Sequence, residues 1–199
     1  MAESSLLQRI ARIMGITDIV EKLSTLQFSD LQSLLLEVIA RKTKGLNASR
    51  MLSLSASNRF VQPCDISQRA FVFFDSIAYQ LLPETAYAME LSPVAPLGIN
   101  STLASISQKN ILGTIRFAEV LADATTALAI ECAKIRKVRL HLDHKDDTHV
   151  TIASSTRALR VQKFDDIKGF TPHFRTFALA TAGRDAGGEM FEKIHAMNH

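Results

Sequence analysis

The sequence has few cysteines, a small charge excess and no long apolar run. Each of these features argues against one class of protein. Its only cysteines, Cys64 and Cys132, lie far apart and in neither metal-ligand nor redox spacing, so we expect both to be reduced and partly buried. Lys plus Arg (23) against Asp plus Glu (20) gives a formal charge of +3, too small an excess to indicate nucleic-acid binding by itself. No stretch approaches the length of a membrane span, and the N-terminus lacks the features of a secretory signal. The sequence therefore predicts a cytoplasmic protein without a membrane partner.

The composition is that of an ordinary globular protein. Hydrophobic residues make up 47% and charged residues 22% of the 199 residues, enough for a substantial core. We predict an N-terminal helical subdomain over residues 1–56 and an α+β domain over residues 57–199. The expected fold class is α+β, with a mostly antiparallel sheet and flanking helices.

Residues 1–45 have the pattern of amphipathic helices. Two apolar stripes have helical spacing: Leu6, Ile10, Ile13 and Met14, and then Leu31, Leu34, Leu35, Val38 and Ile39. Ser5 and Ser29 are at capping-box spacing from a glutamine, and Gly15 and Gly45 lie where helices would end. We expect a short helix over residues 18–26 between these two helices. The three helices together are predicted to form a structural subdomain that carries no catalytic or binding residues.

The remainder alternates helical and strand patterns. Residues 46–65 and 98–110 are polar and predict irregular connections. Ser67 could cap a helix that ends before Pro83 and is buried against a sheet. Further elements are predicted as a strand at 87–91, a strand at 111–120, a helix at 125–137, a hairpin of 138–142 with 149–154, strands at 158–163 and 174–181, and a weak helix at 189–197.

The segment from Arg160 to Phe177 places cations and an aromatic ring on two strands joined by a loop. Arg160-Val161-Gln162, a polar loop and His173-Phe174-Arg175-Thr176-Phe177 resemble motif 2 of class II aminoacyl-tRNA synthetases. The resemblance implies that Arg160 is catalytic and holds the α-phosphate and the substrate carboxylate. It implies that His173 approaches the γ-phosphate and that Phe177 stacks on adenine.

This sequence departs from motif 2 at Gln162, where the family has the glutamate that reads the adenine amino group. A neutral amide can accept the same hydrogen bond through its oxygen. The alternative for the whole segment is an antiparallel hairpin with a buried phenylalanine and two exposed cations.

Two further segments occur in the order of the same family. The helix ending at residue 82 and the strand from Tyr87 to Pro93 look like motif 1, which implies a homodimer interface. Asp123-Ala124-Thr125 resembles the short motif of histidyl-tRNA synthetase and its relatives that binds the α-amino group of the amino acid. The alternative for Asp123 and Thr125 is a helix N-cap.

The resemblance covers about residues 66–182 and lacks motif 3, the glycine-rich strand and helix that supply a second arginine to ATP. The resemblance thus implies either a shortened relative or a paralogue that lost catalysis, as in the histidine-biosynthesis regulatory subunit. The resemblance implies ATP, Mg²⁺ and an amino-acid-like carboxylate as ligands, with acyl-adenylate formation if the protein is active. The alternatives are a non-catalytic dimeric scaffold and, with less support, a tRNA-binding accessory domain.

Residues 141–149 contain three histidines and three aspartates around an expected turn. His141 and His149 would share a face only if the hairpin paired them, and acidic residues are ordinary in turns. We therefore predict no metal site there. No serine or cysteine has a convincing base beside it in the sequence, so a hydrolase is disfavoured.

Overall fold

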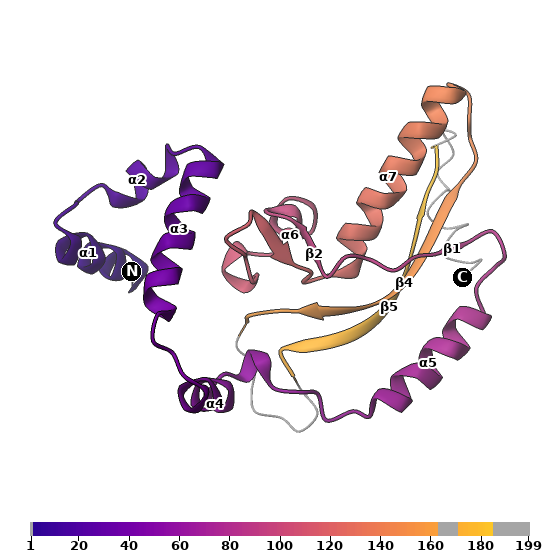
Figure 1. Cartoon of the computed structure of the whole chain (residues 1–199). Helices are drawn as coiled ribbons and strands as arrows, with labels where there is room; N and C mark the ends of the chain where they lie inside the picture. Colours follow the sequence, from indigo (N-terminus) through magenta and orange to yellow (C-terminus); the bar gives the residue numbers. More distant parts are fainter. Residues whose placement is uncertain (1, 163–170, 185–199) are drawn as a thin grey trace.

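The computed structural model describes residues 2–162 and 171–184, with side chains from residue 6 onward, and has an α+β architecture, as predicted (Figure 1). The helices are α1 (Ala2–Met14), α2 (Ile19–Ser24), α3 (Phe28–Thr43), α4 (Ala48–Ser57), α5 (Gln68–Gln80), α6 (Ile99–Leu103) and α7 (Ala124–Leu142). Single 3₁₀ turns are η1 (Arg59–Val61) and η2 (Gln108–Asn110). The strands are β1 (Tyr87–Ala88), β2 (Val94–Pro96), β3 (Ala118–Val120), β4 (Val150–Leu159) and β5 (His173–Ala182). Within these described residues, no helix is both long and apolar enough to cross a bilayer.

Two small sheets organise the C-terminal part. In the order β1-β4-β5, β1 runs parallel to β4, whereas β4 and β5 pair antiparallel over ten residues each. The second sheet is the antiparallel pair β2-β3. The amide of Leu121 donates to the carbonyl of Pro93 (3.2 Å) and that of Leu159 donates to the carbonyl of Leu121 (2.7 Å), which ties β3 to the end of β4.

Helix α7 packs on one face of the β4-β5 ribbon and forms the core there. Side chains alternate between the faces of a strand, so the even-numbered residues of β4 and β5 form this α7 face. Val150 and Ile152 are fully buried against Leu128 and Cys132 of α7. Small residues of β5 complete the layer: Ala178, Ala180 and Ala182.

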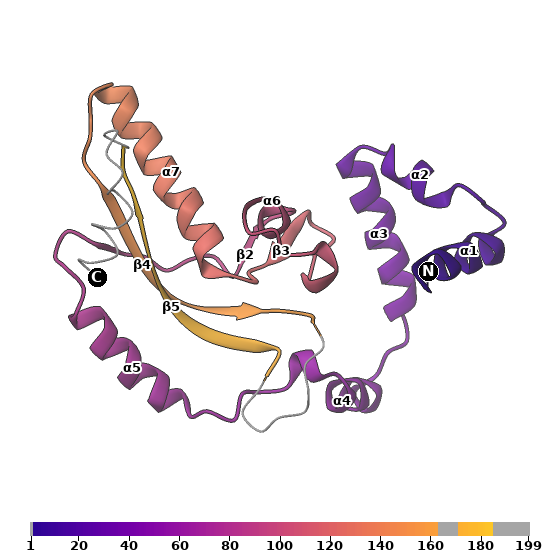
Figure 2. The ribbon, with the colours of Figure 1, turned by 180° about the vertical axis from the view of Figure 1, so that it is seen from behind.

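Helix α5 lies along the opposite face, which the odd-numbered residues of β4 and β5 form and which we call the α5 face (Figure 2). The side chains of Asp75 and Tyr79 reach the strand: the Ser155 hydroxyl donates to Asp75 (2.6 Å) and its amide donates to the Tyr79 hydroxyl (2.9 Å). Since β1 ends at Ala88, it does not reach this amide, and Tyr79 supplies the acceptor. The sequence predicted a helix buried against the sheet, but no residue of α5 is fully buried.

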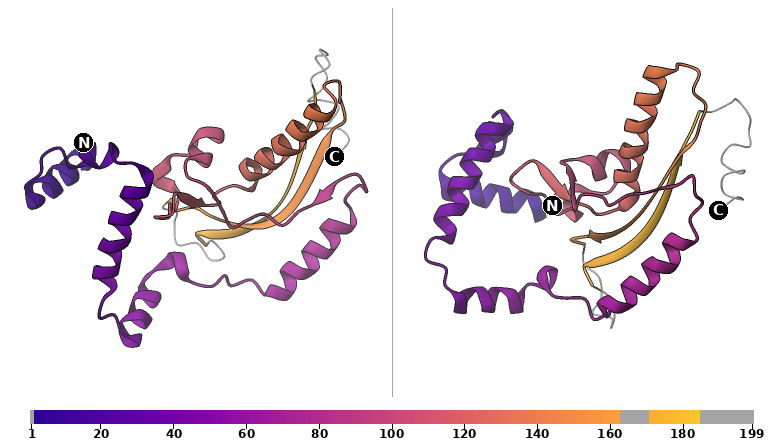
Figure 3. Two further views of the ribbon diagram at one scale, coloured as in Figure 1. Left: turned by 45° about the horizontal axis from the view of Figure 1, so that its top comes forward. Right: turned by 45° about the vertical axis from the view of Figure 1, so that its right-hand side comes forward.

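The first four helices extend from the body as an arm (Figure 3). Among the described side chains of residues 6–57, only Ala11 is buried. Gly15 (φ 66°) and Gly45 (φ 88°) end helices in the left-handed conformation, as predicted. A contact between the rings of Phe28 and Phe117, with centroids 4.6 Å apart, joins α3 to the turn before β3.

Several predicted boundaries in the N-terminal half were wrong. Helix α1 begins at Ala2, so Ser5 lies within it, and α3 is preceded by Gln27, whose carbonyl accepts from the amides of Asp30 and Leu31. Ser29 is therefore in the first turn rather than at the cap. The connection expected at 46–65 contains α4, because the Asn47 side chain caps it by accepting from the Arg50 amide (2.9 Å).

The predicted hairpin of 138–142 with 149–154 was also wrong. Helix α7 continues to Leu142, and β4 is one strand from Val150 to Leu159 instead of two. The 111–120 strand is reduced to β3, and the connection at 98–110 contains α6 and η2. The helix predicted at 189–197 lies outside the described residues.

Candidate functional site

The predicted site residues lie on two sides of the β4-β5 ribbon. Arg160, directly after β4, contacts the start of α7 beside Asp123, on the α7 face. His173 and Phe177 are odd-numbered residues of β5 and lie on the α5 face. The structure thus brings Arg160 and Asp123 together but does not bring them to His173 and Phe177.

Arg160 and Asp123 form a closed cluster at the N-terminus of α7. Arg160 donates from Nε to the Ala122 carbonyl (2.9 Å) and from Nη2 to Asp123 Oδ2 (3.2 Å), and its guanidinium carbon lies 5.5 Å from the Phe174 ring centroid. Asp123 Oδ1 accepts from the amide (2.9 Å) and hydroxyl (2.7 Å) of Thr125. Both carboxylate oxygens are engaged, so the N-cap interpretation of Asp123 and Thr125 describes the observed geometry.

Phe177 and Gln162 are also engaged with the protein. The Phe177 ring packs edge-on against Tyr79 and Phe74, with centroids 5.1 and 6.4 Å away. The backbone carbonyl of Gln162 accepts from Arg59 Nη2 at 2.8 Å. Neither residue lines the cavity that opens beside His173.

That cavity, of about 550 Å³, lies between the segment leading into α5 and the end of the sheet. Its walls are mainly apolar, and Arg157 and His173 are its charged or titratable nitrogen groups. The larger apolar contributors are Pro63, Ile66, Phe71, Pro93, Val120 and Leu159. We call it the α5-face pocket.

His173 is held in one tautomer at the wall of the α5-face pocket. Its Nδ1 lies 2.7 Å from Nη1 of Arg157, and its Nε2 lies 2.7 Å from the carbonyl oxygen of Gln62. Arginine only donates and a carbonyl only accepts, so these two contacts are both satisfied by the tautomer with its proton on Nε2. His173 therefore positions Arg157 instead of offering a free N–H to a ligand.

Arg157 and Arg175 lie directly opposite each other on β4 and β5, and sequence reasoning missed both. Their guanidinium carbons lie 5.4 and 5.7 Å from the centroid of the Phe71 ring. Arg175 Nη2 pairs with Asp75 at 2.5 Å, whereas no carboxylate pairs with Arg157 in residues 2–162 and 171–184. Directly opposed like charges destabilise a sheet, and within this described part of the chain only Arg175 of the pair has a carboxylate counter-charge.

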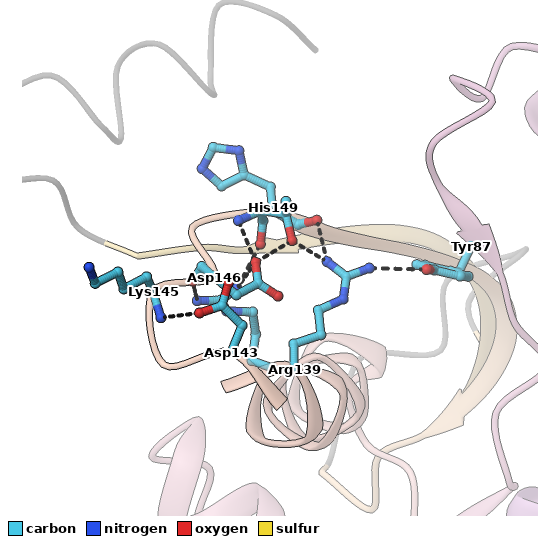
Figure 4. A network of polar contacts seen from close by, with 8 residues as sticks. Tyr87, Arg139, Asp143, Lys145, Asp146 and His149 are labelled. Carbon is cyan, nitrogen blue, oxygen red and sulfur yellow. Dashed lines mark hydrogen bonds and ion pairs between the residues drawn. The ribbon is translucent and has the colours of Figure 1, made fainter. Parts of the chain in front are cut away.

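The histidine- and aspartate-rich segment forms a polar network rather than a hairpin (Figure 4). Arg139 donates to the hydroxyls of Thr148 (2.8 Å) and Tyr87 (3.1 Å), which connects α7 to β1. Hydrogen bonds from Thr148 and, less strongly, the charge of Arg136 lower the pKa of Asp146. In the part of the chain with described positions, no three His, Cys, Asp or Glu side chains form a group suited to a metal ion.

Glu119 is fully buried, and its hydrogen-bond donors among the described residues are all uncharged amides. Its Oε1 accepts from the backbone amide (2.9 Å) and side-chain amide (2.8 Å) of Asn100, and its Oε2 accepts from the Gly98 amide (2.8 Å) and Gln108 Nε2 (2.9 Å). Burial alone raises the pKa of Glu119, but these hydrogen bonds outweigh it, so that the pKa is lowered overall. The carboxylate anchors the loop at 98–110 to β3.

No family model matches the sequence, and comparison with curated proteins found no significant match.

Proposed function

We propose that the α5-face pocket binds an adenine nucleotide or a closely similar ligand that joins a flat apolar ring to an anion. The observation that supports this most directly is the opposed pair Arg157 and Arg175, to which residues 2–162 and 171–184 supply one carboxylate, Asp75, for two guanidinium groups. A bound anion beside Arg157 would supply the missing negative charge.

The volume and the apolar lining of the pocket suit the planar ring of such a ligand. A volume of about 550 Å³ is within the range of roughly 300–1,000 Å³ that is usual for small-molecule sites. The apolar walls suit a planar base. One N–H of Arg157 is directed to His173, so other donors of the guanidinium remain for phosphate or carboxylate oxygens.

This proposal assigns Arg157 the phosphate contact that the sequence suggested for Arg160. The guanidinium of Arg160 is directed to Ala122 and Asp123, and these contacts favour a structural role. We propose binding without catalysis. If the ligand is ATP, Mg²⁺ would be carried mainly by the phosphate oxygens.

Isothermal titration calorimetry with ATP, ADP and adenosine tests the proposal. We expect ATP and ADP to bind, and adenosine to bind more weakly because it has no anion. Arg157→Gln should weaken ATP binding by roughly tenfold or more, the usual effect of losing a charged hydrogen-bond donor. Arg69→Gln is the matched control, since it removes an exposed arginine of α5 that does not line the pocket.

Two outcomes contradict the proposal. Wild-type protein without measurable affinity for ATP or ADP would exclude it. Binding that survives Arg157→Gln but is lost in a folded Arg160→Gln variant would move the site to the α7 face, as the sequence suggested.

A second candidate function, a dimeric scaffold, is favoured by the outer side of α5. Phe73, Ile77 and Leu81 recur every four residues there and are 70%, 44% and 79% exposed. Tyr87 of β1, which follows α5 in the chain, is 47% exposed. Together they would form an apolar surface suited to a second copy.

Light scattering coupled to size-exclusion chromatography tests this second candidate. We expect a dimer that Phe73→Glu converts to a monomer, because a charge placed in an apolar interface is costly. Val138→Glu, which places the same charge at an apolar residue of α7 that is 61% exposed, is the control. A wild-type protein that stays monomeric at high concentration would contradict the scaffold.

A further inference from the structure

A second, smaller cavity lies between α7 and the segment that contains β2. Its volume is about 240 Å³, below the roughly 300 Å³ at which drug-sized sites begin. Leu91, Ala95 and Ile99 form one side and are each only 8% exposed, and Ala127 and Ile130 of α7 form the other. Such walls admit a short aliphatic group.

Among the residues that the structure describes, Glu131 and Lys134 are the charged ones in the wall of this cavity. They form an ion pair along α7 with 2.6 Å between Lys134 Nζ and Glu131 Oε1, and their side chains are 63% (Lys134) and 30% (Glu131) exposed. An ion pair this exposed contributes little to stability, so it can open at small cost. The hydroxyl oxygen of Ser92, also in the wall, accepts from the Val94 amide and keeps its proton free to donate.

We infer that this cavity binds a short aliphatic zwitterion, a molecule with one ammonium group, one carboxylate and an apolar chain of about four carbons. The ligand ammonium pairs with Glu131 and its carboxylate pairs with Lys134, so that one internal ion pair is exchanged for two. The apolar chain lies against Leu91, Ala95 and Ile99, where burial is favourable.

The charges in the wall select a zwitterion over a simple ion. An amine would pair with Glu131 and leave Lys134 without its partner, and a carboxylic acid would do the reverse. Only a ligand with both charges keeps each wall residue paired. The inference does not depend on nucleotide binding, because the two cavities share no wall residue.

Calorimetry with L-norleucine as the probe tests the inference. We expect binding that is weakened roughly tenfold or more when the ligand is pentylamine or hexanoate, each of which has one of the two charges. Glu131→Gln and Lys134→Met should each weaken norleucine binding to a similar degree. Ala127→Leu, which fills the cavity without changing its charges, should abolish it.

The control is Glu37→Gln, which breaks the Glu37–Arg41 ion pair of α3 (2.6 Å) and should leave norleucine binding unchanged. The two charge variants alter an exposed pair and should fold, so the test stands even if Ala127→Leu does not fold. No binding of norleucine at about 10 mM would overturn the inference, as would binding that either charge variant leaves unchanged. ATP affinity, measured in parallel, should be the same in all these variants.

Discussion

Replacing Glu119 with glutamine tests whether the buried carboxylate holds the loop at 98–110. The wild-type carboxylate accepts four hydrogen bonds, two at each oxygen, and one at each oxygen comes from a backbone amide: Asn100 at Oε1 and Gly98 at Oε2. A glutamine side chain has one oxygen and one NH₂ group. In either orientation its NH₂ group points at a backbone N–H, which cannot turn around to accept.

The expected loss of stability follows from those contacts. One buried backbone donor is left without an acceptor, at about 1–3 kcal/mol, and the remaining bonds lose the benefit of the negative charge. The Gln108 amide can turn and present its oxygen, which limits the loss. We therefore expect Glu119→Gln to lower the free energy of unfolding by about 2–4 kcal/mol.

Urea unfolding followed by far-ultraviolet circular dichroism measures this change. The pKa of Glu119 is lowered in the folded state, so its contribution is complete above the ordinary glutamate pKa of about 4.3 and is lost as pH falls through the folded value. The difference between wild type and Glu119→Gln should thus be constant near neutral pH and shrink at lower pH.

Glu90→Gln, the same change at an exposed position, is the control and should have little effect. A Glu119→Gln protein within about 0.5 kcal/mol of wild type at pH 7 would refute the reasoning. A difference that grows with acidification would refute the sign of the pH dependence.

Three other changes are predicted from the contacts described. Asp123→Ala removes the side-chain cap of α7 and should cost about 1 kcal/mol in urea unfolding. Asp75→Asn leaves Arg175 without its carboxylate and should increase amide hydrogen exchange in α5. Burial and, less strongly, the charge of Glu131 raise the pKa of the Cys132 thiol, so a thiol reagent should modify Cys64 first in the native protein.

Each of these three predictions would be contradicted by a specific result. Asp123→Asn should retain most of the stability that Asp123→Ala loses, since asparagine also caps helices, and equal losses would contradict the cap. Exchange in α5 that is unaffected by Asp75→Asn would show that apolar contacts alone hold the helix. Modification of both cysteines at one rate would contradict the burial of Cys132.

The first three helices and the helix after Ser67 could be predicted because their signals are local. The end of α7 could not, since Val138 and Leu140 fit a strand as well as a helix, and the decisive contacts come later in the chain. Arg139 extends the helical stretch by donating to Thr148 and Tyr87, nine residues after it and 52 residues before it. α4 was missed because its serines resemble those of a loop, although Asn47 caps the helix.

The candidate site was harder to predict than the fold because the faces of a strand depend on register. Arg157 and Arg160 are three residues apart, so they lie on opposite sides of an extended chain. Which of them shares a side with His173 is decided by the pairing of β4 with β5, a contact between distant segments. Glu119 was missed for a similar reason, since its four donors come from Gly98, Asn100 and Gln108, which lie 11 to 21 residues before it in the chain.

The hydrogen bond from the Ser155 amide to the Tyr79 hydroxyl has a consequence for association between molecules. β1 covers β4 only as far as residue 153, and an uncovered strand edge beyond that point is a template for another chain. The next outward-facing amide is that of Ser155, and it already donates to the Tyr79 hydroxyl. An incoming strand therefore cannot use this amide as a hydrogen-bond donor. We therefore expect α5 to oppose edge-to-edge association at this position without adding a strand to the sheet.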